Sequence, residues 1–172
     1  MIASIVVPPE HDLKLIAHNA GVTDFSKLLY DNGMLYIEDC SQEALDQAYA
    51  EYSHADIERA RQLARVAAVR YEYETAGVML NGFKIDTSRD SQGLILGAAV
   101  QVILDPEYSL NWKTPEGWLL FSGPQITAIA TCVRKHVQAC FDRERVLADA
   151  INNGTFDGSM LYQGWPEKPP VV

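Results

Sequence analysis

The stretch SGPQITAIATCVRKHVQACFDRERVLADAINN, residues 122–153, decides how the rest of the chain is organised. Ser122 is a favourable N-cap, Pro124 suits a first turn, and Gln125 completes a capping box. Gly154 follows as a stop signal. Apolar residues recur between these ends at helical spacing: Ile126, Ile129, Ala130, Val133, Val137, Cys140, Phe141, Leu147, Ala148 and Ile151. The pattern predicts one long amphipathic helix with a continuous apolar stripe.

Residues 1–40 predict a small β-rich unit. Ile2 to Val7 is a β-branched run that two prolines end, which indicates a short strand. Residues 10–21 fit a helix and a strand equally well. Asn32 and Gly33 lie between two apolar, aromatic-rich runs, and this pair favours a β-hairpin because it accepts positive φ angles.

Residues 41–76 predict a connecting helix or helix pair. Ser41 is an N-cap, and a second cap at Ser53 predicts a break or kink near Tyr52. The part after the break is apolar on two faces, so it has two surfaces to cover. We expect both faces to pack within the chain, with a contact between copies as the alternative.

Residues 77–153 predict an α+β domain in the order hairpin, helix, hairpin, helix, because two hairpins backed by two helices can close one core. Asn81-Gly82 favours the first turn, and Pro115-Glu116 the second. The helix between them, residues 93–104, is capped by Thr87 or Ser88, and its apolar composition predicts burial.

Residues 154–172 predict an extended C-terminal tail with many apolar anchors, which we expect to dock on this chain or on another one. The whole chain is therefore expected to be α+β: a small β-rich N-terminal unit, a long connecting helix, the hairpin-helix-hairpin-helix domain and the tail. Its segments are 1–40, 41–76, 77–153 and 154–172.

The composition excludes several classes of protein. The net charge of −9 argues against a nucleic-acid binder, because such affinity rests largely on Lys and Arg. No apolar run is long enough to span a bilayer, and no signal peptide is recognisable. The three cysteines cannot all pair within the chain, so we expect reduced thiols and synthesis in a cytoplasm.

Four residues with chemically active side chains, Cys132, His136, Cys140 and Glu144, recur four positions apart. Cys132 and Cys140 would lie about 12 Å apart along a helix axis, so one metal ion cannot bind both. Side chains at i and i+4 are usually parallel neighbours, which disfavours a Cys-His catalytic dyad. We predict no metal, cofactor or catalytic residue, with Cys140 in the core and Cys132 and His136 toward the edge of the apolar stripe.

Glu144 falls near the middle of the apolar stripe, where a buried carboxylate needs a partner. Arg70 on the earlier helix is the candidate for a buried ion pair. Alternatively, the core ends near Phe141 and the last turns project into solvent or toward another subunit. Asp86 and Asp90 flank the start of a predicted helix, which favours capping over catalysis.

Three blocks in order resemble an uncharacterised domain common in proteins of tailed bacteriophages and prophages, often encoded beside tail-fibre genes. They are GVMLNGFKIDTSRDSQGLILGA, NWKTPEGWLLF and HVQACFDRE, within about Tyr71 to Asn153. Residues 30–52, YDNGMLYIEDCSQEALDQAYAEY, are similar to the leader of such tail-region proteins. The resemblance implies a phage tail setting and brings no catalytic or ligand-binding residue with it.

We therefore expect a non-enzymatic phage tail protein, associated with the tail fibre or baseplate, that binds other tail proteins as a virion structural subunit and forms a homo-oligomer or hetero-complex. A tail-fibre assembly chaperone is one alternative. A small glycan-acting hydrolase with Trp112 or Trp118 as a platform is another, disfavoured because no paired carboxylates are evident. Nucleic-acid binding and membrane insertion are not expected. The candidate partner-binding residues are Val66, Tyr73, Phe156, Leu161, Tyr162 and Trp165.

Overall fold

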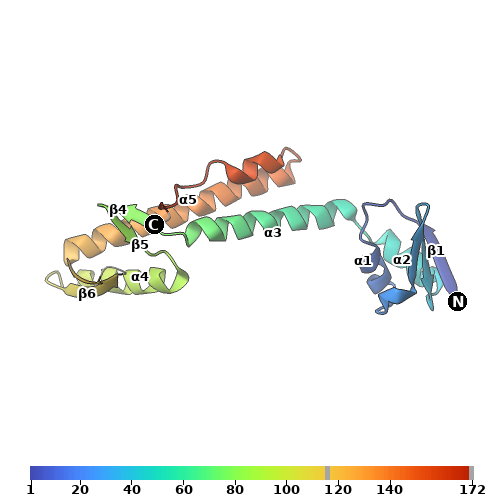
Figure 1. Cartoon of the computed structure of the whole chain (residues 1–172), viewed down its shortest axis with the longest axis horizontal. Coiled ribbons are helices and arrows are strands. Elements are labelled where there is room, and N and C mark those ends of the chain that lie inside the picture. Colours follow the sequence, from blue (N-terminus) through green and yellow to red (C-terminus); the bar gives the residue numbers. More distant parts are fainter. Residues whose placement is uncertain (115–116, 171–172) are drawn as a thin grey trace. The chain divides into compact units, whose positions relative to one another are not determined.

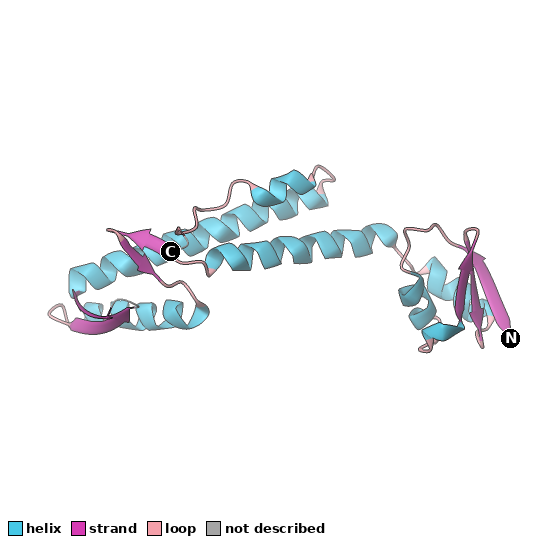
Figure 2. Cartoon of the chain, viewed as in Figure 1, coloured by secondary structure: helices cyan, strands magenta, loops and turns pink. Residues whose placement is uncertain are grey.

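Helices and small antiparallel sheets share the chain in a computed structural model that describes residues 1–114 and 117–170 (Figures 1 and 2). The mixed α+β class predicted from the sequence is therefore confirmed. The chain divides into unit 1, Met1–Ala60, and unit 2, Arg61–Val172. This division falls inside a helix, whereas the four segments predicted from the sequence end at residues 40, 76 and 153.

Unit 1 contains a three-stranded antiparallel sheet in the order β1-β3-β2. Strand β1 (Ile2–Val6) pairs with the central strand β3 (Met34–Glu38), and β2 (Leu28–Asp31) pairs with the other edge of β3. The predicted turn at Asn32-Gly33 forms, with positive φ angles at both residues. A 3-10 turn, η1 (Phe25–Lys27), precedes β2.

Residues 10–21, which the sequence left undecided, contain the helix α1 (Leu13–Asn19). The side chain of Asp12 caps it by accepting a 3.0 Å hydrogen bond from the backbone N–H of Leu15. Helices α2 (Gln42–Ala50) and α3 (His54–Glu74) are separate, because Ser53 caps α3 through the N–H of Asp56. The apolar core of unit 1 forms between its sheet, α1 and α2.

Unit 2 carries two short ribbons, each followed by a helix. Strands β4 (Val78–Leu80) and β5 (Phe83–Ile85) precede α4 (Arg89–Leu104), and β6 (Ser109–Thr114) and β7 (Gly117–Ser122) precede α5 (Gly123–Asn152). Asn81 and Gly82 have the positive φ angles that their turn requires. The predicted turn at Pro115-Glu116 lies outside the described residues.

Two apolar clusters of unit 2 share helix α5. The tail core joins α3, α5 and the C-terminal segment: Val66, Leu147, Ile151 and Leu161, with Leu63, Val69, Phe156, Met160 and Trp165 against them. The hairpin core joins α4, α5 and both ribbons: Ile95, Ile129, Val133 and Val137, with Val78, Leu80, Ile85, Trp112, Phe121 and Ala130 against them. The apolar stripe of α5 is therefore divided between two neighbouring cores.

The C-terminal segment turns back after α5 and runs along unit 2 (Figure 1). It contains the 3-10 helix η2 (Gly158–Tyr162). Arg143 of α5 donates a 2.7 Å hydrogen bond to the carbonyl of Met160, and the indole of Trp165 stacks on Tyr73 of α3 at 5.2 Å between ring centroids. The described part of the tail therefore docks on its own chain.

Candidate functional site

Glu74, near the end of α3, is completely buried, with 0% of its surface exposed. Its carboxylate forms an ion pair with Arg89, whose Nε lies 2.9 Å away, and accepts a 3.1 Å hydrogen bond from Nε2 of Gln92. Both partners lie on α4. Glu74 also pairs with Arg70 one turn earlier on α3. A charge in this position requires such partners, because an isolated buried carboxylate is strongly unfavourable.

Arg70 connects Glu74 to α5. Its Nε lies 3.0 Å from Oε2 of Glu144, and its guanidinium lies over the ring of Phe141 at 4.5 Å from the centroid. The predicted partners Arg70 and Glu144 are thus in contact, as part of a larger network that the sequence did not reveal. The i, i+4 spacing of Arg70 and Glu74 was the one sequence signal for it.

Thr87 and His136 complete the polar interior around the end of α3. The hydroxyl of Thr87 donates to the carbonyl of Glu74 at 2.6 Å and accepts from the N–H of Gly77 at 2.9 Å. Nε2 of His136 lies 2.9 Å from the carbonyl oxygen of Tyr73. These contacts satisfy carbonyl groups that the end of a helix leaves without intrahelical partners.

One sequence prediction is corrected here, and one left open is decided. His136 is buried, with 6% of its surface exposed, rather than at the edge of the apolar stripe. Its position follows from the carbonyl of Tyr73, which needs a donor. Ser88 caps α4 by accepting from the N–H of Ser91, whereas Thr87, the other candidate cap, serves α3 instead.

The side chains of the network around Glu74 and Arg70 are paired with one another inside unit 2. Burial, together with the negative charge of Glu74, raises the pKa of the Cys140 thiol to about 11 and outweighs the opposite effect of Arg70. At neutral pH Cys140 is therefore a protonated thiol, 4.0 Å from Nε2 of His136. Within residues 1–114 and 117–170, no group of three or more His, Cys, Asp or Glu is arranged to hold a metal ion.

The candidate partner-binding residues lie mostly inside unit 2. Val66 and Leu161 are buried in the tail core, and Phe156 packs against them. Tyr73 and Trp165 stack on each other. Tyr162 is exposed, and its hydroxyl accepts a 3.0 Å hydrogen bond from Arg65. A charge at Val66 would therefore disrupt the tail core, so it is no clean probe of a contact between copies.

The outer face of α4 carries the largest departure from the sequence prediction, because residues 93–104 were expected to be buried. Only Ile95 and Ala98 are buried in this helix. Five other apolar residues of the helix are exposed: Leu94, Leu96, Val100, Ile103 and Leu104. Ile103 is 80% exposed. Helix α5 covers one side of α4, with side chains of both ribbons packed against the same cluster, and the other side stays open. The apolar composition alone could not reveal which side would be covered.

We define the α4 outer face as Gly93, Leu96, Gly97, Val100, Ile103 and Leu104. No charged residue occurs between Asp90 and Asp105. A Cβ atom added at either glycine of this face would meet no other atom within 4 Å. These glycines therefore do not serve a close contact within the described chain, although glycine in a helix interior costs about 1 kcal/mol relative to alanine.

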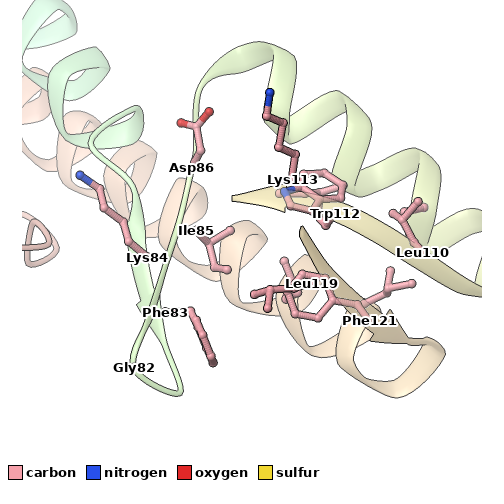
Figure 3. A pocket seen from close by; sticks show the side chains of 14 residues that line it. Gly82, Phe83, Lys84, Ile85, Asp86, Leu110, Trp112, Lys113, Leu119 and Phe121 are labelled. Atoms are coloured by element: carbon pink, nitrogen blue, oxygen red, sulfur yellow. The ribbon is translucent and has the colours of Figure 1, made fainter. Parts of the chain in front are cut away.

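A pocket of about 270 Å³ lies between the β4–β5 ribbon and the β6–β7 ribbon, against α4 and α5 (Figure 3). We call it the hairpin pocket. Its lining is mainly apolar and comes from all of these elements: Gly82, Phe83, Lys84, Ile85, Asp86, Ile95, Ala98, Leu110, Trp112, Lys113, Leu119, Phe121, Ile126 and Ile129.

A hydrolase would need a cleft that gathers candidate acids and bases, and the sequence offers Asp86, Asp90, His136 and Glu144. Only Asp86 of these lines the hairpin pocket. His136 and Glu144 belong to the network around Glu74 and Arg70, and Asp90 lies in the first turn of α4. Asp86, Asp90, His136 and Glu144 are therefore not gathered in the hairpin pocket.

Comparisons with known proteins match residues 57–162 to a family described as Domain of unknown function (DUF4376). The match covers more than half of the chain and includes the network, the hairpin pocket and the α4 outer face. Comparison with curated proteins and with solved structures gave no significant match. In the described residues, no helix combines the length and the apolar character needed to cross a membrane.

Proposed function

The chain belongs to the family described as Domain of unknown function (DUF4376), and we propose that it is a non-enzymatic bacteriophage tail protein. In this proposal it is associated with the tail fibre or baseplate and binds other tail proteins as a virion structural subunit. It would be made in the host bacterial cytoplasm and end in the virion tail. The sequence blocks at residues 77–98, 111–121 and 136–144 support the phage setting through their resemblance.

The observation that carries the binding role is the exposed α4 outer face. Leu96, Ile103 and Leu104 are each more than three-fifths exposed on a helix that has no charged residue beyond its first turn. Contiguous apolar patches of this kind on a protein surface mark binding sites for other proteins. Two further apolar side chains, Trp118 and Leu120 of β7, are also exposed in unit 2.

The glycines of this face would let a helical or extended segment of a partner protein approach α4 closely. Gly93 and Gly97 are one turn apart and have open space where a Cβ would be. Small residues on a helix surface allow a second backbone to approach closely. In the proposal, the hairpin-helix-hairpin-helix part supplies this contact surface, and the small β-rich N-terminal unit is a separate module joined to it through the connecting helix.

Mass spectrometry of purified virions tests the proposal. A virion subunit is expected in constant stoichiometry with known fibre or baseplate proteins. A tail-fibre assembly chaperone would instead be bound to fibre protein in infected cells and absent from finished particles. Complete absence from virions would contradict the structural-subunit proposal and favour the chaperone.

A double variant, Leu96→Glu with Ile103→Glu, tests the binding surface. Both side chains are exposed, so the fold should tolerate the change, whereas two carboxylates in an apolar contact would prevent assembly. The matched control is Val146→Glu, an exposed apolar position on α5. We expect the double variant to be lost from virions and the control to be retained. Retention of both at the wild-type level would contradict the assignment of the α4 outer face.

A further inference from the structure

The hairpin pocket has a closed apolar floor and an open mouth. Its floor consists of Ile95 of α4 with Ile126 and Ile129 of α5, and all three side chains are buried. Its mouth lies at the turn between β4 and β5, where Gly82 and Phe83 border the pocket and are exposed. The pocket is therefore open to solvent on the side of this turn.

Aromatic side chains form part of the pocket walls. Trp112 of β6 and Phe121 of β7 line the space above the floor. Figure 3 shows the side chains of Leu119 and Phe121 directed into the same space as Ile85. Apolar cavities hold water poorly, and their lining atoms lose contacts when nothing fills the space. Because aromatic rings pack favourably on one another, these walls favour a flat aromatic group over water.

The volume of the hairpin pocket limits the size of a group that could fill it. An apolar cavity of about 150 Å³ in a protein takes a single benzene ring. The pocket here measures about 270 Å³. It therefore suits an apolar group of two fused rings, and its size is close to the lower end of common ligand sites.

Two charged residues border the pocket near its mouth, Lys84 in β5 and Asp86 directly after it. Asp86 accepts hydrogen bonds from the N–H of Ser88 at 2.9 Å and from the hydroxyl of Ser91 at 2.6 Å. Burial acts to raise the pKa of Asp86, but these hydrogen bonds outweigh it and lower that pKa, so Asp86 stays a carboxylate engaged with its own loop. In Figure 3 the side chain of Lys84 leads away from the pocket.

The third charged residue that borders the pocket, Lys113, belongs to the other face of the β6–β7 ribbon. It lies opposite Trp118 in the strand register, whereas Trp112 lies opposite Leu119. Opposite residues of an antiparallel pair share a face, and successive residues alternate between faces. Lys113 therefore shares the outer face with exposed Trp118, while Trp112 and Leu119 line the pocket. None of the three charged lining residues directs its charge at the floor.

We propose that the hairpin pocket binds an uncharged aromatic compound of about two fused rings, which rests on the isoleucine floor and contacts Trp112 and Phe121. A charged ligand would lose its hydration there without gaining a partner of opposite charge. The lining comes from β5, α4, β6, β7 and α5, which explains why no short motif in the sequence indicated the site. The proposal does not depend on a role in a phage tail.

Calorimetric titration of the full chain with three small compounds tests the size and the charge of the ligand. We expect saturable binding of the neutral alcohol 2-naphthalenemethanol, with a Kd below about 1 mM. Benzyl alcohol should bind about tenfold more weakly, because one ring leaves part of the pocket unfilled. The anion 2-naphthoate should also bind about tenfold more weakly, because its carboxylate would be desolvated without a partner.

Two neighbouring leucines of β7 supply matched variants. Leu119→Trp puts a larger side chain into the pocket and should weaken the binding of 2-naphthalenemethanol about tenfold or more. Leu120→Trp makes the same change on the outer face of the ribbon, where Leu120 is exposed, and should leave the affinity unchanged. Equal affinity of these two variants for the alcohol would contradict binding in the hairpin pocket.

Methyl NMR of the wild-type chain locates the bound ring without any variant. The isoleucine methyl groups of the pocket should shift with 2-naphthalenemethanol in proportion to its occupancy: Ile85, Ile95, Ile126 and Ile129. Ile37 in unit 1 and Ile151 in the tail core should not shift. Shifts centred on either of these two residues would overturn the proposal.

Three further outcomes of the titrations decide against an uncharged small molecule. They are the absence of saturable binding up to about 1 mM, tighter binding of 2-naphthoate than of the alcohol, and a strong preference for N-acetyltryptophanamide. The last compound presents a tryptophan side chain together with peptide groups. If it binds more than about tenfold more tightly than the alcohol, the occupant is a side chain of a partner protein and the proposal is overturned.

Discussion

The tail core and the hairpin core both rest on helix α5, yet one is closed by the chain and the other is not. In the tail core, Val66 and Leu161 are completely or almost completely buried, because η2 and Trp165 cover the gap between α3 and α5. At the hairpin core the same α5 stripe leaves a pocket and an exposed helix face beside it. Other segments of the chain therefore cover the apolar side chains at one end of α5 and leave some of them accessible at the other.

The elements that pack on each core explain the difference. Helix α4 packs on α5 through one side, where Ile95 meets Ile129 and Val133. The apolar side chains on its opposite side, Leu96, Val100 and Leu104, remain exposed. The tail, by contrast, runs back along α5 and supplies its own anchors.

The largest expected effect concerns the charged network that joins α3, α4 and α5. Glu74→Ala should lower the free energy of unfolding by about 3–5 kcal/mol, because Arg70 would keep a largely buried charge without this partner. Urea denaturation measures it. The matched control is Glu72→Ala, an exposed carboxylate 4.0 Å from Lys168, with an expected loss below about 1 kcal/mol. Similar losses in the two variants would show that the network is not a stabilising element.

The next comparison uses one tryptophan from each region. Trp165→Ala should lower the free energy of unfolding by about 2–3 kcal/mol, because the indole stacks on Tyr73 and donates a hydrogen bond to the carbonyl of Leu161. Trp118 on β7 is 70% exposed, so Trp118→Ala should change the free energy of unfolding by less than about 0.5 kcal/mol. Thermal denaturation of both variants tests the contrast, and an equal effect would mean that the tail does not close its core.

These two comparisons also show what the sequence could predict. The capping residues at Ser122 and Gln125 and the turn at Asn81-Gly82 determine local structure directly, because each acts on its own backbone. Glu74 was missed because Arg89 and Gln92 reach it from another helix.

The outer face of α4 and the hairpin pocket escaped prediction for a related reason. An apolar composition indicates that a helix can be buried, but its packing on α5 decides which side is covered. The exposure of Ile103 therefore depends on tertiary packing, which the local sequence does not determine. The ion pair of Arg70 with Glu144 was accessible to prediction because one charge on an apolar stripe calls for one opposite charge.

A smaller effect of opposite sign is expected on the α4 outer face. Gly97→Ala should raise the free energy of unfolding by about 0.5–1 kcal/mol, because alanine favours the helix and its Cβ meets no neighbour. The same change should weaken incorporation into the virion if a partner backbone approaches this face. Gly123→Ala is the contrasting variant: its Cβ would lie 3.2 Å from the carbonyl oxygen of Pro106, so a loss of stability is expected. A stabilised Gly97→Ala variant with normal incorporation would argue against a close contact there.

The smallest expected effect is a difference in reactivity among the three cysteine thiols of the unmutated protein. Burial raises the pKa of Cys40, and the pKa of Cys140 is raised to about 11, whereas Cys132 is only partly buried. In the native protein at pH 8, iodoacetamide should therefore modify Cys132 first. Peptide mass spectrometry over time gives the order of modification. Early labelling of Cys140 would show that the interior between α3 and α5 opens readily.

Hydroxyl-radical footprinting of the chain in purified virions and in the isolated protein tests the central claim most directly. Leu96, Ile103 and Leu104 are exposed in the isolated chain, so their oxidation should fall several-fold in the virion. Exposed Leu29 in unit 1 and exposed Val146 on α5 give the reference rates in both samples. Oxidation of the α4 outer face at the same rate in virion and isolated protein, relative to that reference, would contradict the account.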